Sequence, residues 1–94
     1  GIDGDVAHLD FDHCFEVRSG ATARIRDERF SLQLGSSLPY RVVYTPRDLD
    51  FFCVEPVSHV NNAVHMADPM AHGLRDLAAG ESFEAGMSLT VNRL

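Results

Sequence analysis

Alternation of apolar and polar residues is the main pattern along this chain, and it predicts β-strands. Residues 21–26 alternate strictly, and the same two-residue period resumes over 30–34. The polar run Asp27–Arg29 between them predicts the turn of a hairpin. Residues 40–45 are rich in strand-forming types and are followed by Pro46, which has no N–H to give to a ladder. They predict a third strand.

Two more strands are predicted towards the C-terminus. Residues 51–54 are a continuous apolar run, typical of a strand covered on both faces, and Pro56 closes it, so Glu55 is expected at the end of a buried strand. Residues 82–91 alternate without a break. From Pro56 to Gly80 no period persists, which predicts a long loop with one helical turn. A loop of this length in a compact domain is usually functional.

These elements predict an all-β, antiparallel fold. Five or so strands with an apolar side need a second layer to cover them, and we expect 94 residues to be too few to supply both layers. Residues 1–8 are small and acidic without periodicity, which predicts a loop or a truncated start. The whole of 1–94 is therefore expected to be a single partial domain.

Composition and charge exclude several classes of function. A hydrophobic content of 45% with interspersed charges indicates a folded chain. Eight Lys and Arg against 14 Asp and Glu give a formal charge of -6, the wrong sign for binding nucleic acid. No apolar stretch approaches the ~20 residues of a membrane helix, and no signal-peptide pattern is present at the N-terminus. We expect a cytoplasmic protein without a membrane partner.

The cysteines and histidines do not predict a metal site. Cys14 and Cys53 lie far apart among apolar neighbours, which suits free thiols better than a disulfide, and neither belongs to a Cys-x-x-Cys pair. His59, His65 and His72 in the long loop have spacings that fit no common zinc pattern. The sequence therefore predicts no metal.

Glu55 is the first residue that could carry chemistry. A carboxylate held at the rim of a dry strand binds its proton more tightly and can act as a general base near neutral pH. The alternative is a strand-end glutamate that caps a backbone amide or pairs with an arginine, and spacing alone favours this structural role. Arg75, in the approach to the last strand, is expected to tie the long loop to that strand.

Asp12 is the second candidate. It lies with His13 between Phe11 and the pair Cys14-Phe15, so apolar neighbours are expected to anchor it on both sides. An anchored aspartate is suited to accept hydrogen bonds from the hydroxyls of a sugar. The alternative is a turn aspartate that bonds its own backbone, which the local sequence alone favours.

Four blocks of the chain resemble, in order, the C-terminal part of the aldose 1-epimerase (galactose mutarotase) family. Residues Phe11–Phe15 resemble the family's Asp-His-x-Phe element, and Tyr40–Pro46 resemble the strand that ends in Tyr-Thr or Trp-Thr. Residues Phe52–His59 are similar to the block that holds the catalytic glutamate, and Gly73–Ser82 to the approach to the last strand. The blocks span nearly the whole chain.

The resemblance implies a large β-sandwich, called a supersandwich, and an isomerase that interconverts the α and β anomers of a free aldose without cofactor or metal. In that mechanism a carboxylate takes the proton of the C1 hydroxyl while an imidazolium protonates the ring oxygen, and the ring opens and closes again. Glu55 matches the family's general base, and Asp12 matches the aspartate that binds sugar hydroxyls. Val42 stands where several relatives place a sugar-binding glutamine, so the preferred sugar is open.

One departure concerns the general acid. The family's acidic histidine and a second sugar-contacting histidine precede the Asp-His-x-Phe element, and His8, the histidine found before it here, resembles neither. We expect the chain to be a fragment or a truncated product that is inactive alone. The alternative is a non-catalytic carbohydrate-binding or oligomerising β-domain that uses Asp12 and the loop after Pro56. Uncovered strand faces would favour a homo-oligomer.

Overall fold

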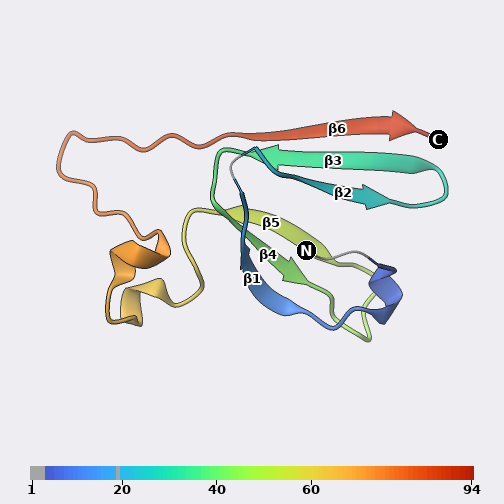
Figure 1. The fold of residues 1–94 in the computed structure, drawn as a ribbon, viewed down its shortest axis with the longest axis horizontal. Coiled ribbons are helices and arrows are strands. Elements are labelled where there is room, and N and C mark those ends of the chain that lie inside the picture. The colour runs from blue at the N-terminus through green and yellow to red at the C-terminus, as the bar shows by residue number, and fades with distance from the viewer. Residues whose placement is uncertain (1–3, 19) are drawn as a thin grey trace.

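The computed structural model describes residues 4–18 and 20–94, and this part of the chain is almost entirely β-structure and loop (Figure 1). Three short 3-10 helices are present, η1 (Val6–His8), η2 (Ala63–His65) and η3 (Pro69–His72). The strands are β1 (Asp12–Glu16), β2 (Thr22–Arg26), β3 (Phe30–Ser36), β4 (Tyr40–Tyr44), β5 (Cys53–Val57) and β6 (Met87–Arg93). The predicted all-β, antiparallel class is confirmed.

The first sheet has the order β1-β4-β5 and is antiparallel throughout. Its central strand, β4, is buried from Tyr40 to Val43, whereas β1 and β5 are half-buried or exposed. Arg41 is only 4% exposed, and its guanidinium donates to the backbone carbonyls of Leu38 and Tyr40. The predicted strand over 40–45 is confirmed, with Thr45 just beyond its end.

The second sheet has the order β2-β3-β6. The predicted hairpin is confirmed as β2 and β3, and its turn depends on Asp27, whose Oδ1 accepts hydrogen bonds from the backbone N–H of Arg29 at 2.7 Å and of Phe30 at 2.8 Å. This is the local bonding that makes aspartate frequent in turns. Leu34, in β3, is the most buried side chain of this sheet's strands, at 5% exposed.

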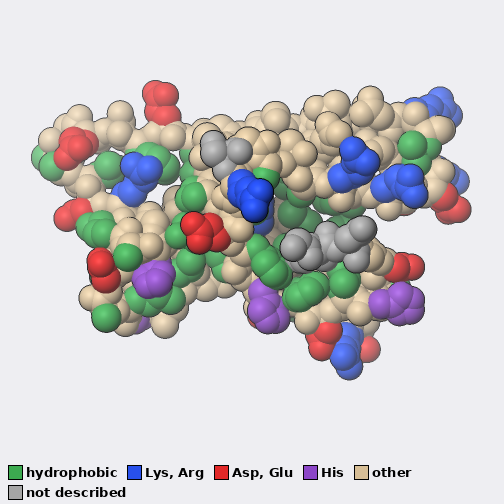
Figure 2. Space-filling model, viewed as in Figure 1, with side chains coloured by type: hydrophobic (Ala, Val, Ile, Leu, Met, Phe, Trp, Pro, Cys, Tyr) green, Lys and Arg blue, Asp and Glu red, His purple; other side chains and the backbone are tan. Residues whose placement is uncertain are grey.

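The buried core is small and lies mainly along β4. Figure 1 shows the two sheets one beside the other, and Figure 2 shows hydrophobic side chains between them in the middle of the view. The buried hydrophobic residues are Leu34, Tyr40, Val42, Val43 and Ala63. The chain therefore forms two small sheets, an arrangement consistent with a sandwich-like fold, although much of its apolar surface is left uncovered.

The long loop after β5 lies against one face of the first sheet. It closes on itself where the N–H of Val60 donates to the carbonyl of His72 at 3.1 Å. Gly73, with φ 91°, lies so near the Tyr40 ring and the Ser58 carbonyl that a Cβ there would meet them at 2.8 and 2.5 Å. The predicted loop is thus confirmed, but it contains two helical turns instead of one and continues to Gly86.

Two expected strands differ in detail from the structure, and one strand was not expected. β5 runs from Cys53 to Val57 and contains no buried residue, so it is not covered on both faces. It lies at the edge of its sheet, which allows Pro56 to lie inside it. The last strand begins at Met87 instead of residue 82, because Ser36 at the end of β3 is the last residue that offers it a partner. A strand at β1 was not expected from alternation.

No helix in residues 4–18 and 20–94 is long and apolar enough to cross a membrane. Residues 6–8 of the expected loop at the start form η1, whose cap is Asp5: its carboxylate accepts from the N–H of Ala7 at 2.9 Å. Residues 1–3 of that predicted segment lie outside the described residues.

Candidate functional site

Glu55 lies in the middle of β5, directly opposite Val42 of β4. The side chain is exposed, so the predicted dry rim at the end of a buried strand is wrong. The physical reason is the position of β5: it is the edge strand of the first sheet, and within the described residues the face that carries Glu55 is left open to solvent there. Glu55 is therefore a solvated carboxylate on a sheet edge.

Asp12 is the first residue of β1 and pairs with Tyr44. It lies in a strand, so the alternative of a turn aspartate is wrong, and the aromatic rings next to it in the sequence pack on the opposite face of β1. Phe11 and Phe15 meet edge to face with ring centroids 5.6 Å apart, and the His13 ring lies 5.4 Å from that of Phe11. Phe11, His13 and Phe15 lie on one face of β1, and the exposed Asp12 carboxylate lies on the opposite face.

The register brings both predicted site residues to one face of the first sheet. Directly paired residues of an antiparallel sheet point to the same side, and so do residues two apart along a strand. Cys14, Val42 and Glu55 form one row across the three strands, and Asp12, Tyr44 and Cys53 form the next.

The two carboxylates lie on either side of β4. From strand spacings of about 4.8 Å and a rise of about 3.4 Å per residue, their backbones are roughly 10 Å apart across the sheet and roughly 7 Å along it. Val42 of β4 lies between the two, in the row of Glu55.

The two cysteines share this face with the carboxylates, which the sequence did not indicate. Both are free, as predicted. Burial raises the pKa of the Cys14 thiol, partly offset by the backbone N–H of Asn61. Burial also raises the pKa of the Cys53 thiol, and the negative charge of the neighbouring Glu55 carboxylate adds to that effect. Both thiols therefore stay protonated at neutral pH and are poor nucleophiles.

The long loop borders the face and covers part of it. Its Asn61 reaches the Cys14 thiol, and Val42 in the same row is only 8% exposed. In the row beyond, Tyr44 is 37% exposed and Asp12 is exposed. The open part of the face therefore consists of the Asp12 row and the exposed Glu55 at the edge of the next row. It is bounded by the loop that follows β5, where the sequence predicted a functional loop.

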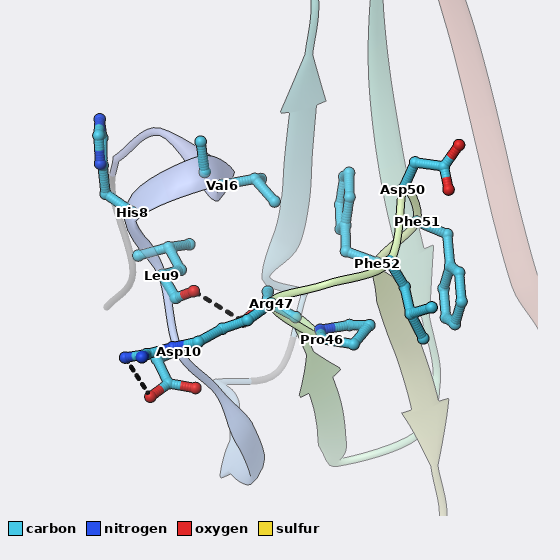
Figure 3. Close-up of a pocket in the computed structure, with 12 residues that line it drawn as sticks. Val6, His8, Leu9, Asp10, Pro46, Arg47, Asp50, Phe51 and Phe52 are labelled. Atoms are coloured by element: carbon cyan, nitrogen blue, oxygen red, sulfur yellow. Dashed lines mark hydrogen bonds and ion pairs between the residues drawn. The ribbon is translucent and has the colours of Figure 1, made fainter.

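A hollow of about 690 Å³ lies at the Asp12 end of the first sheet, between η1 and the segment from β4 to β5 (Figure 3). Arg47 reaches beneath Leu9 to form an ion pair with Asp10 at 2.9 Å, and the Thr45 hydroxyl donates to the Leu9 carbonyl at 3.1 Å. A second hollow of about 620 Å³ adjoins Pro56–Asn62 and Phe83. Neither is lined by Asp12 or Glu55, so the two carboxylates lie outside both hollows. The exposed part of the sheet face that carries Asp12, Tyr44 and Glu55 is called the shelf below.

The remaining candidates have structural surroundings. In the described part of the chain no three His, Cys, Asp or Glu side chains are grouped closely enough to hold a metal ion. His59 shares a hydrogen bond of 2.8 Å between its Nδ1 and the Ser58 Oγ. Arg75 lies over the Phe83 ring, 4.3 Å from its centroid, so the arginine contacts the segment before β6 through a cation–π interaction.

Chemically, the shelf offers two carboxylates that can accept hydrogen bonds and protons, with apolar and aromatic residues of β4 between them. No family model, no curated protein and no solved structure matches the chain. A proposal for the function of the site therefore rests on the geometry of the site and on the ordered blocks of the sequence.

Proposed function

We propose that the shelf is the sugar-binding face of an aldose 1-epimerase, with Glu55 as general base and Asp12 as ligand of the sugar hydroxyls. The observation that carries the proposal is that Asp12, Val42 and Glu55, which come from three separate blocks of the family resemblance, fall on one face of one sheet. A one-residue change of register would have turned any of the three to the opposite face, so their shared face supports the resemblance.

In this function the Glu55 carboxylate takes the proton from the C1 hydroxyl and returns it when the ring closes from its other side. Asp12, two strands away, accepts hydrogen bonds from hydroxyls at the far side of the ring. The resemblance assigns protonation of the ring oxygen to a histidine of a preceding segment. No histidine of residues 1–94 matches that role, so an assay of these residues has to add an acid.

The test supplies that acid as imidazole buffer and follows exchange between α and β glucose and galactose by NMR. We expect the chain to raise the exchange rate above that of imidazole alone, in proportion to its concentration. The Glu55→Gln variant should lose at least about nine tenths of this increment, since general base catalysis contributes about 10²–10⁴-fold. Glu84→Gln is the matched control, because Glu84 is exposed outside the strands.

Two results would decide against the proposal. If Glu55→Gln were as active as the parent chain, Glu55 would not be the base. If the sugars bound saturably, with weaker binding by Asp12→Asn but no increment in exchange, the chain would be a carbohydrate-binding β-domain instead. Val42, in place of a polar side chain between the carboxylates, is the feature that favours this second function.

A further inference from the structure

The four edges of the two sheets differ in how well they are protected against pairing with another strand. Natural edge strands usually carry charges or proline, which discourage such pairing. β1 has an acidic residue at each end, β2 carries Arg24 and Arg26, and β5 contains Pro56. β6 has a single charged residue, Arg93, near its C-terminal end, and no proline. Among the described strands, β6 is the least protected edge.

β6 also presents an apolar row that the fold leaves open. It pairs with β3 without a bulge from Met87 to Arg93, and this register puts Met87, Leu89 and Val91 on the same face as the buried Leu34. These three side chains are 56–65% exposed. Within residues 4–18 and 20–94, β3 is the only strand bonded to β6. The apolar face of the sheet therefore continues to an edge that has room for another strand.

We propose that a second copy of this chain pairs with β6 in antiparallel orientation about Thr90. This register places Thr90 opposite Thr90 of the second copy, Leu89 opposite its Val91, and Met87 opposite its Arg93. All apolar positions stay on one face, because the register shifts by an even number of residues. The contact is two-fold symmetric and self-complementary. It joins the β2-β3-β6 sheet of one copy to the same sheet of the second copy, which gives one sheet of twice the width.

Charge selects this edge for a second copy. The same self-pairing of β2 about Arg24 would bring two arginines face to face, and that of β1 about Cys14 would bring Asp12 opposite Glu16. Like charges directly opposite each other destabilise a strand pair. A chain of net charge -6 repels its own copies in general, but β6 contributes no acidic residue. In the proposed register the two copies of Arg93 lie at opposite ends of the contact.

Sedimentation velocity of the full chain over a concentration series tests the proposal. We expect a reversible monomer–dimer equilibrium. Thr90→Lys brings two ammonium groups to the symmetry centre and should raise the dimer dissociation constant at least tenfold. Thr22→Lys is the matched control: it makes the same change at an exposed position of β2, on the opposite edge of the same sheet, and should shift the constant less than twofold.

A charge reversal makes the test independent of any loss of folding. Thr90→Glu alone should also be monomeric, and an equimolar mixture of Thr90→Glu and Thr90→Lys should form a mixed dimer, because opposite charges then face each other. A parent chain that stays monomeric at all concentrations would overturn the proposal. So would equal effects of Thr90→Lys and Thr22→Lys, or a mixture in which no dimer returns.

Discussion

β4 and β3 are each the central strand of a three-stranded antiparallel sheet, yet they differ sharply in burial. Four of the five residues of β4 are buried, whereas Leu34 is the single buried residue of the seven in β3. Both strands have a neighbour on each side, so pairing does not explain the contrast. The difference lies in what covers the faces of the two sheets.

The first sheet owes part of its cover to the long loop. Gly73 approaches the Tyr40 ring, and Asn61 of the same loop reaches Cys14. Among the described residues nothing covers β6 of the second sheet in a comparable way, and Leu89 and Val91 there are more than half exposed. A strand's pattern thus determines which of its sides is apolar, while a distant segment determines whether that side becomes core.

The largest expected effect on stability comes from a substitution that disturbs the loop where it packs on β4. Gly73 and Gly80 have nearly the same left-handed backbone, φ 91° and φ 86°, but a Cβ at Gly73 would meet the Ser58 carbonyl and the Tyr40 ring, and nothing lies within 4 Å at Gly80. We expect Gly73→Ala to lower the free energy of unfolding by about 2–4 kcal/mol, from backbone strain and overpacking together. Gly80→Ala should cost about 1 kcal/mol, from strain alone.

Urea unfolding followed by circular dichroism measures both variants. The Gly73→Ala substitution should also expose Tyr40. In a Tyr44→Phe background, where Tyr40 is the one tyrosine and the chain has no tryptophan, fluorescence gives a second, local readout. Equal losses in the two variants would mean that the loop does not press on Tyr40, and that the contrast between the sheets has another cause.

The next effect compares the same substitution in the two sheets. Val43 of β4 is 9% exposed and Val91 of β6 is 56% exposed. Removing two methyl groups from a buried site costs about 2 kcal/mol, counting about 0.8 kcal/mol for each and a small cavity. We therefore expect Val43→Ala to lower the free energy of unfolding by about 2 kcal/mol, and Val91→Ala by less than about 0.5 kcal/mol.

The same urea titrations distinguish the outcomes. A cost for Val91→Ala close to that for Val43→Ala, and dependent on protein concentration, would show that β6 is buried in an assembly. Such a result would contradict the difference in burial between β4 and β6, and it would favour the proposed pairing about Thr90.

Local patterns of the sequence predicted the parts of the fold that depend on neighbouring residues. The β2–β3 hairpin follows from alternation and from an aspartate in the turn, and β4 from strand-forming residues before Pro46. The start of β6 and the edge position of β5 could not be predicted, because both depend on which strand lies alongside. The buried Arg41 is a similar case: hydropathy places arginine outside, and two carbonyls of its own segment make burial possible.

For the candidate site, the sequence nominated Asp12 and Glu55, and the resemblance gave them roles. It could not predict that Glu55 is exposed, because a continuous apolar run is equally compatible with a covered strand and with an edge. Nor could it predict that Cys14 and Cys53 share the face of the carboxylates, since this follows from the register of β1 and β5 on β4. The assigned roles stay predictions.

The smallest expected effect concerns the hairpin, where a turn, and not a covered core, holds the second sheet locally. Hydrogen bonds from the N–H of Phe30 and of Arg29 hold the pKa of Asp27 below its ordinary value of 3.8. A carboxylate with a lowered pKa in the folded state stabilises that state above the unfolded pKa, and loses this contribution as the pH falls through the folded one. We therefore expect the hairpin to weaken below about pH 3.8, and not between pH 5 and 8.

NMR titration of the amide protons of Arg29 and Phe30 measures this directly. Both should move upfield with one shared midpoint below 3.8 as their acceptor is protonated, while the amide protons of Val42 and Val43 do not follow that midpoint. Asp27→Asn should abolish the shared titration, because no charge is left to lose. Asp48→Asn, an exposed change outside the hairpin, should leave it intact. If the amide protons of Val42 and Val43 followed the same midpoint as those of the turn, the two sheets would respond to pH as one unit. The inference that the turn stabilises the second sheet separately would then be wrong.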